Sequence, residues 1–164
     1  ETQEPGVRII DKTGPLANPA DRDHCIQYMV AIPLIFGRLT AADYEDAIAV
    51  DPRIDALRSK MQVRENPTFT QEYYAPDKRY IGNAIQVFFQ DGSSTPRIQV
   101  DFPIGHRKRR QEGMPVLVKK FEASVAAHFS PKQTAPILAT FQDVAKLDAM
   151  SVNELMATLV TNGA

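Results

Sequence analysis

A histidine and a tyrosine, His24 and Tyr28, stand four residues apart in a segment whose sequence predicts a helix. At that spacing, two side chains share one face of a helix. A neutral imidazole can accept a proton while a phenol donates one, which is the combination that general acid–base catalysis requires. Such a pair in a mostly buried helix more often has a structural role, so the residue types alone favour the structural interpretation.

A second group of chemical interest is the basic run GHRKRR at residues 105–110. Arginine binds carboxylates through two parallel hydrogen bonds, so the run is a candidate substrate-binding segment. The candidate substrate-binding residues are Arg22, beside His24, and His106, Arg107, Arg109 and Arg110. A solvated charge run, or ion pairs to a neighbouring domain, is the commoner role of such a segment. Nucleic-acid binding is not expected, because the net charge is −1 and no aromatic residues interleave with the arginines.

The cysteine and histidine content excludes several kinds of cofactor site. The single cysteine, Cys25, cannot form an internal disulfide or supply the several thiolates that hold an iron–sulfur cluster. With only three histidines, a dedicated zinc site is not expected either. We therefore expect neither a metal nor another cofactor, and we expect a reducing compartment.

The sequence predicts neither a membrane anchor nor a secretion signal. The longest apolar run, residues 29–36, is less than half of the roughly 20 residues that cross a bilayer, and it contains Pro33. The first six residues, ETQEPG, contain neither a methionine nor the basic and apolar regions of a signal peptide. They are typical of a cut inside a longer protein, and we interpret the chain as a fragment.

The helix that must position His24 and Tyr28 is predicted to cover residues 19–36. Asn18 is a good N-cap followed by a proline, and Gly37 is a natural stop. Shorter elements are expected on either side, namely strands at residues 7–11 and 61–64 and helices after the caps Thr40 and Asp51.

Alternating apolar residues at 81–89 and 98–102, separated by Asp91-Gly92, predict a β-hairpin. The aromatic residues expected in the core from these strands are Phe88, Phe89 and Phe102. The predicted fold class is therefore α+β, with an antiparallel sheet and hairpin packed against helices over residues 1–112. A C-terminal helical tail is expected over residues 113–164.

The tail is predicted to contain three amphipathic helices. Their apolar stripes are formed by Leu117, Phe121, Ile137, Leu138, Phe141, Leu155 and Leu159. Burial of one such side chain contributes roughly 1.5–3 kcal/mol, so the stripes should not stay in contact with water. We expect them to fold back on the first part of the chain, to self-associate or to be poorly ordered.

Two long strings resemble one enzyme family in the expected order. IIDKTGPLANPADRDHCIQYMVAIPLIFGRLTAADYED and, further on, FPIGHRKRRQEGMPVLVKKF are similar to the 2-methylcitrate dehydratases of the propionate-degrading methylcitrate cycle. The resemblance spans essentially the whole chain but corresponds only to the C-terminal third or so of such enzymes.

The resemblance implies an arrangement that composition alone does not. Members of the family have a large N-terminal helical domain, a smaller α+β lid, and C-terminal helices that return to the helical domain, with the active site between the domains. In the related cis-aconitate decarboxylases, an H-x-x-x-Y stretch faces that cleft, and His24 and Tyr28 match it. The resemblance also implies a homodimer in the cytoplasm, or in the mitochondrial matrix of a eukaryote, and a dehydration without an iron–sulfur cluster.

The implied reaction removes water from a tricarboxylate, 2-methylcitrate, to give 2-methyl-cis-aconitate. It needs a base, an acid and cationic groups that bind carboxylates. His24 and Tyr28 are the predicted catalytic residues, although the sequence does not decide which is base and which is acid. The alternatives are a cis-aconitate decarboxylase and a non-enzymatic α+β binding module, and the fragment alone is expected to be inactive.

Overall fold

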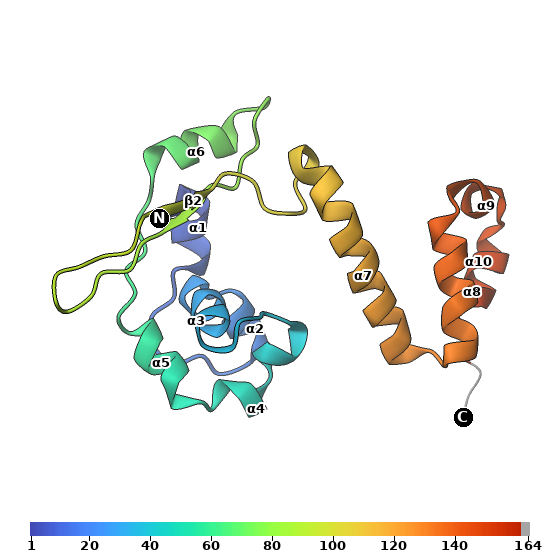
Figure 1. The fold of residues 1–164 in the computed structure, drawn as a ribbon, viewed down its shortest axis with the longest axis horizontal. Helices are drawn as coiled ribbons and strands as arrows, with labels where there is room; N and C mark the ends of the chain where they lie inside the picture. The colour runs from blue at the N-terminus through green and yellow to red at the C-terminus, as the bar shows by residue number, and fades with distance from the viewer. Residues whose placement is uncertain (162–164) are drawn as a thin grey trace. The chain divides into compact units, whose positions relative to one another are not determined.

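A computed structural model describes residues 1–161 of the chain. The chain divides into two compact units, Glu1–Pro103 and a second that begins at Ile104 (Figure 1). The elements of the first unit are α1 (Glu4–Ile10), α2 (Pro19–Asp23), α3 (Ile26–Phe36), η1 (Ala41–Tyr44), α4 (Asp46–Ala49), α5 (Pro52–Arg58), α6 (Pro67–Tyr74), β1 (Asn83–Ile85) and β2 (Ile98–Val100). Those of the second are η2 (Arg107–Arg109), α7 (Arg110–His128), α8 (Pro131–Gln142), α9 (Val144–Ala149) and α10 (Val152–Thr158). The α+β class is confirmed.

The core of the first unit forms where α3 packs against α5. Its fully buried members are Cys25, Tyr28, Ala31, Ile32 and Ile54. α3 ends as predicted at Gly37, whose backbone adopts a φ of 70° and whose N–H donates to the Pro33 carbonyl. A left-handed conformation of this kind suits glycine because it has no Cβ.

The helix predicted over residues 19–36 is broken into two, and the expectation of one continuous helix is wrong. α2 stops after five residues, with His24 as its C-cap, and Cys25 is extended and caps α3. The break lets the Cys25 side chain enter the core, where its exposure is 0%. A continuous helix would keep the faces at 24 and 28 aligned, whereas the break separates them.

The strand predicted at residues 7–11 is also wrong, because these residues belong to α1. Pro5 lies at the start of that helix, where its missing N–H costs nothing. Glu4 and Arg8 form an i,i+4 ion pair of 2.7 Å on its surface. Residues 61–64 form no strand either, and the only ladder contact there is a single bridge between Thr2 and Glu65.

A cap followed by proline starts three helices of the first unit. The side chains of Asn18, Asp51 and Asn66 each accept a hydrogen bond from a backbone N–H of the following turn. The first two starts were predicted, but α6 was missed although Asn66-Pro67 carries the same signal. The predicted cap Thr40 forms a capping box with Asp43 and opens the short η1.

The predicted hairpin is confirmed, although its strands are short. Asn83 pairs with Val100 and Ile85 with Ile98, and an isolated bridge joins Phe88 to Ser94 nearer the turn. The expectation that Phe88 and Phe89 lie in the core is wrong, since they are 74% and 53% exposed. Phe102 is half-buried, with its ring 4.2 Å from the ring of Tyr80, centroid to centroid.

The first two residues add a short segment to the hairpin. Glu1 exchanges two backbone hydrogen bonds with Ala84, of 2.7 and 3.0 Å. On the other side, the Thr2 N–H donates to the Arg64 carbonyl and the Asn66 N–H donates to the Thr2 carbonyl. Residues 1–2 therefore lie between the hairpin and residues 64–66.

In the second unit, the predicted apolar stripes pack mainly on one another, although Leu117 remains 50% exposed. α8 contacts α7, α9 and α10. Ile137 is 1% exposed, and the rings of Phe121 and Phe141 meet edge to face at 5.2 Å. The stripes therefore find partners within the tail, an outcome that the sequence analysis did not include.

Ile32→Ala is expected to destabilise the first unit by about 2–5 kcal/mol, because Ile32 is fully buried on α3 and its removal leaves a cavity. Urea unfolding followed by circular dichroism measures the change. Leu34→Ala on the same helix is the matched control, since Leu34 is 55% exposed and should cost much less. Equal losses for the two variants would contradict the packing described here.

Candidate active site

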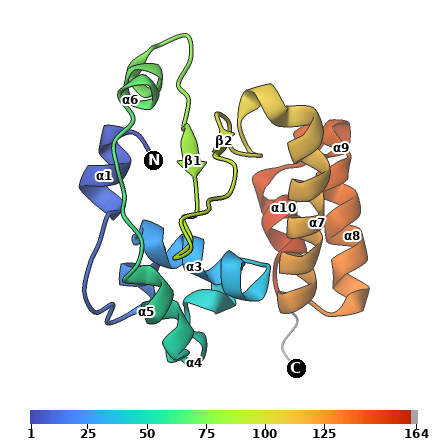
Figure 2. The same ribbon diagram turned by 60° about the vertical axis from the view of Figure 1, so that its left-hand side comes forward.

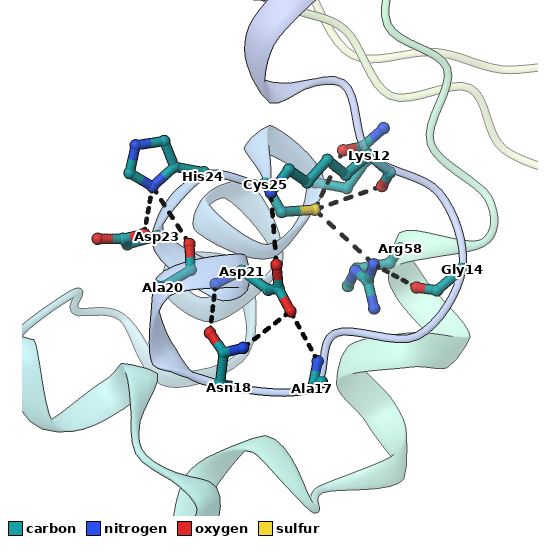
Figure 3. A network of polar contacts seen from close by, with 11 residues as sticks. Lys12, Gly14, Ala17, Asn18, Ala20, Asp21, Asp23, His24, Cys25 and Arg58 are labelled. Carbon is teal, nitrogen blue, oxygen red and sulfur yellow. Dashed lines mark hydrogen bonds and ion pairs between the residues drawn. The ribbon is translucent and has the colours of Figure 1, made fainter.

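His24 lies on the surface at the end of α2, with its ring held by two acceptors. Nδ1 is 2.5 Å from Asp23 Oδ1 and 3.2 Å from the Ala20 carbonyl oxygen (Figure 3). Because both partners accept, Nδ1 carries the ring proton, and Nε2 of the neutral ring keeps a lone pair. The side chain is 58% exposed, so this lone pair is open to a ligand. A carboxylate that orients an imidazole in this way is the arrangement found behind many general bases.

Tyr28, in contrast, is buried, and its hydroxyl already has a hydrogen-bond partner. It is 2% exposed, and its hydroxyl donates to the Asp43 backbone carbonyl at 2.6 Å. Its ring stacks on the ring of Tyr44 with 5.9 Å between centroids. Burial raises the pKa of the Tyr28 phenol above its usual value. The structure therefore does not place His24 and Tyr28 side by side, and the shared helical face predicted for them is wrong.

Arg22 is turned into the protein rather than toward solvent. It is 5% exposed, and its Nη1 donates to the Tyr44 carbonyl at 2.7 Å. Its Nη2 lies 2.7 Å from the carboxylate of Asp46, which is itself exposed. Arg22 and Tyr28 thus both bind residues 43–46, and together they fix this turn against α2 and α3.

Asp43 is the buried acid at the centre of that turn. Its Oδ2 accepts from the backbone N–H and the hydroxyl of Thr40, both at 2.8 Å, and its Oδ1 accepts from Arg38 at 3.0 Å. The Thr40 hydroxyl and N–H, followed by the Arg38 charge, hold the pKa of Asp43 below its usual value despite burial. Every partner of this carboxylate is a donor.

Asp43→Asn is expected to lower the thermal midpoint of the first unit by several degrees at pH 7, because an amide NH₂ would face donors. Since folding lowers the pKa of Asp43, its ionised form stabilises the protein above the ordinary carboxyl pKa of about 4. That contribution is lost as the pH falls through the lower pKa of the folded state. Thermal melts between pH 7 and pH 3 should therefore show the gap between wild type and variant narrowing in acid, and a constant gap would contradict this account.

The basic run lies in the second unit, where it starts a helix. His106 is the N-cap of η2, and its Nδ1 accepts from the Lys108 N–H at 3.2 Å. Arg109 forms an ion pair of 2.8 Å with Glu112. Arg107 belongs to η2 and is exposed, and Arg110 is the exposed first residue of α7. The guanidinium of Arg109 is thus paired within its own turn.

A cavity that the sequence analysis missed lies in the first unit. It has a volume of about 460 Å³ and is lined by residues 12–15 together with Gln27, Asp55, Arg58, Ser59 and Met61. Arg58 donates to the Gly14 carbonyl at 3.0 Å and pairs with Asp55, and its Nη2 lies 3.7 Å from the Cys25 sulfur (Figure 3). The Arg58 Nε is buried and has no partner among residues 1–161. The K-T-G-P string, with its left-handed glycine, was the available signal for a loop of this kind.

Two kinds of feature are absent from residues 1–161. No group of three or more His, Cys, Asp or Glu residues among them is arranged to hold a metal ion. No helix in this part of the chain is both long enough and apolar enough to cross a membrane.

Comparison with known proteins gives consistent matches. A model of the MmgE/PrpD C-terminal domain matches residues 1–145. The chain is 57% identical to the 2-methylcitrate dehydratase of Cupriavidus necator over 155 residues, which are 94% of this chain and 32% of that protein. It is 60% identical to the mitochondrial 2-methylcitrate dehydratase of Yarrowia lipolytica over 148 residues, which are 90% of this chain and 28% of that protein. A 2-methylcitrate dehydratase-like protein, oryR of Aspergillus oryzae, is 40% identical over 158 residues.

These matches confirm the resemblance drawn from the sequence strings. The chain spans about a third of the length of the curated relatives that it matches. The domain match ends at residue 145, inside α9. It therefore covers the whole first unit and leaves out only the rest of α9 and the chain after it. On these grounds, the chain belongs to the MmgE/PrpD family and represents its C-terminal domain.

Proposed function

We propose that this chain is the C-terminal part of a 2-methylcitrate dehydratase, a hydro-lyase of propionate catabolism. The observation that carries the proposal is the 57–60% identity to relatives that bear this name, over 90% or more of the chain. In the reaction, a base removes the proton from the carbon next to a carboxylate. The hydroxyl group on the adjacent carbon then leaves as water, with a proton from an acid, and a carbon–carbon double bond forms.

His24 is the residue that we propose as the base. Its Nε2 lone pair is exposed, and Asp23 on Nδ1 orients the ring and stabilises the positive charge that appears when Nε2 takes the proton. An exposed imidazole with an oriented ring can reach a substrate without any rearrangement of the fold.

Tyr28 is the second catalytic residue that we propose, as a donor to the leaving oxygen or to a carboxylate. Its raised pKa keeps the phenol protonated, which a donor requires. Its hydroxyl would have to exchange the Asp43 carbonyl for the substrate, so this role demands a shift of residues 43–46. For His106, Arg107, Arg109 and Arg110 we propose binding of substrate carboxylates. We propose the same role for Arg22, which would have to exchange the Tyr44 carbonyl or Asp46 for the substrate.

The partners that we propose are a tricarboxylate substrate, an N-terminal helical domain of the same protein, and a second copy in a homodimer. Helices α7 to α10 would pack on the helical domain through apolar side chains that remain exposed in this chain. These are Met114, Val116, Leu117, Val144, Val152 and Met156. We propose the cytoplasm as its location, or the mitochondrial matrix in a eukaryote, as in the name of the Yarrowia relative.

The test is an assay of the longer protein that contains this chain. With 2-methylcitrate, the ultraviolet absorbance should rise as an unsaturated acid forms, and product analysis should identify 2-methyl-cis-aconitate. Release of carbon dioxide from cis-aconitate, without dehydration of 2-methylcitrate, would assign the protein to the decarboxylases instead. Failure of a folded preparation to act on either substrate would favour a binding module.

A further inference from the structure

The hairpin has one edge that is only partly paired. In a strand, the backbone groups of successive residues point alternately to its two sides. Asn83, Ala84 and Ile85 all lie opposite residues of β2, but Ala84 exchanges both of its backbone hydrogen bonds with Glu1. The backbone groups of Asn83 and Ile85 therefore face β2, and those of Ala84 face the other side. Figure 2 shows β1 with β2 on one side and the N-terminus on the other. The segment at residues 1–2 thus covers this edge at one residue only.

Beyond Ala84, the same alternation continues toward the turn. The Val87 carbonyl accepts from the Thr95 N–H at 2.9 Å, and the Phe89 N–H donates to the Ser93 carbonyl at 2.8 Å. Gln86 and Phe88 must then direct their backbone N–H and C=O groups to the opposite side. No hydrogen bond among residues 1–161 reaches the N–H of either residue.

The side chains along this edge are apolar and open. Ile85 is 40% exposed, Val87 37%, Phe88 74% and Phe89 53%. An edge with free backbone groups and flanking apolar side chains is a template for another strand, and proteins normally cover it. We therefore expect another segment to cover this edge in the functional protein.

The contact at Glu1 points to that occupant. A pair that exchanges both hydrogen bonds is an antiparallel pair, so chain preceding Glu1 would run along Ile85, Gln86 and Val87 toward the turn. The Glu1 nitrogen donates to the Ala84 carbonyl, as a strand residue in this register does. Relatives about three times as long supply the chain for it.

We propose that the residues directly before Glu1 in the longer protein form a β-strand that adds antiparallel to residues 84–88. The inference rests on the proposed function, in that the chain is taken as part of a longer dehydratase. The register follows from Glu1 opposite Ala84: the second residue before Glu1 faces Gln86, and the fourth faces Phe88. Each of these two exchanges both backbone hydrogen bonds, and the strand covers apolar side chains on both faces of the hairpin.

Amide hydrogen exchange in the longer protein tests the strand. The N–H groups of Gln86 and Phe88 should exchange at least about 100-fold more slowly than unstructured amides, as do their hairpin-paired neighbours Ile85 and Phe89. In a strand with an open edge, protection would alternate, with Ile85 and Phe89 slow and Gln86 and Phe88 fast. That alternating pattern in the longer protein would overturn the proposal.

An engineered disulfide tests the register of the proposed strand, independently of hydrogen exchange. The residue immediately before Glu1 should lie opposite Ile85 in a non-hydrogen-bonded pair, where Cα atoms are about 4.5 Å apart. Cysteine at that position with Ile85→Cys should form a bond within one chain, and Cys25 does not compete because its sulfur is buried. The control moves the first cysteine one residue further upstream, onto the opposite face, and should not cross-link. Cross-links between two chains, with protection that rises with concentration, would assign the edge to a second copy and refute the proposal.

The proposed strand and the proposed dehydratase function can be refuted separately. Turnover of 2-methylcitrate by a protein with an open edge would refute the strand and leave the function intact. A protected edge and the expected cross-link in a protein without dehydratase activity would refute the function and leave the added strand intact.

Discussion

His24→Ala in the longer protein is expected to lower the rate of 2-methylcitrate dehydration by about 10² to 10⁴-fold, the usual effect of losing one acid–base group. The reason is the exposed Nε2 lone pair of a ring whose other nitrogen is held by Asp23 and Ala20. The measurement is the ultraviolet absorbance of the unsaturated product at saturating substrate. Because the His24 side chain is 58% exposed, the fold and thermal midpoint should stay near those of the wild type.

Asp23→Asn is the graded control for this prediction. It leaves the imidazole in place but removes the carboxylate that accepts from Nδ1, so the ring is no longer held in the same tautomer and a loss of rate is expected. The pH profile of turnover should also change in Asp23→Asn, which a purely structural aspartate would not cause. Wild-type turnover by a folded His24→Ala variant would return His24 to a structural role.

Tyr28→Phe extends the same experiment to the second group. The ring and its stacking on Tyr44 remain, and only the hydroxyl is lost. A large fall in turnover with little change in stability would support a catalytic phenol. Wild-type turnover with a loss of about 1 kcal/mol in stability would instead assign the hydroxyl to its bond with the Asp43 carbonyl.

The isolated 164-residue chain is expected to have no measurable dehydratase activity, which is the largest effect of all. Elimination requires a base, an acid and carboxylate-binding groups within hydrogen-bond reach of one substrate. This chain spans about a third of the length of its relatives, so most of the residues that could line a site are outside it. The same absorbance assay, with the longer protein as the positive control, measures the difference.

Folding of the isolated chain must be checked so that inactivity has one cause. Circular dichroism should show a mainly helical protein, and urea unfolding should show a cooperative transition. Robust turnover by the isolated chain would refute the view that it is one part of a larger catalytic unit.

Helix starts were predictable because they depend on a few neighbouring residues. Asn18 and Asp51 both act as caps, as their types and the residues after them indicated. A cap satisfies backbone N–H groups within one turn, so no distant part of the chain is involved. The same local logic would have found α6 from Asn66-Pro67.

Errors arose where distant packing decides the outcome. The apolar run at residues 7–11 fits a strand or a helix equally well, and the contact of α1 with α6 selects the helix. The helix break at His24 depends on the burial of Cys25 beside Gln27 and Arg58, which come from different elements. The sequence therefore pointed to His24 and Tyr28 as candidates, but the helical face predicted to hold both side chains is not formed.

The exposure of the hairpin aromatics was beyond the reach of sequence analysis for another reason. Phe89 continues the alternating apolar positions of the strand and Phe88 lies on the opposite face, and burial is the usual fate of large aromatic residues. Among residues 1–161 the two rings remain exposed, which agrees with the added strand proposed above.

The buried Cys25 has a practical consequence for work on this protein. Its sulfur is 0% exposed and lies 3.3 Å from Gln27 Oε1 and 3.4 Å from the Lys12 carbonyl oxygen, and it is the only thiol in the chain. A thiol reagent can reach it only when α2, α3 and α5 separate. The rate at which the thiol is labelled therefore measures how often the first unit opens. A reagent that forms a coloured product with thiols can therefore report the rate of opening without any engineered probe.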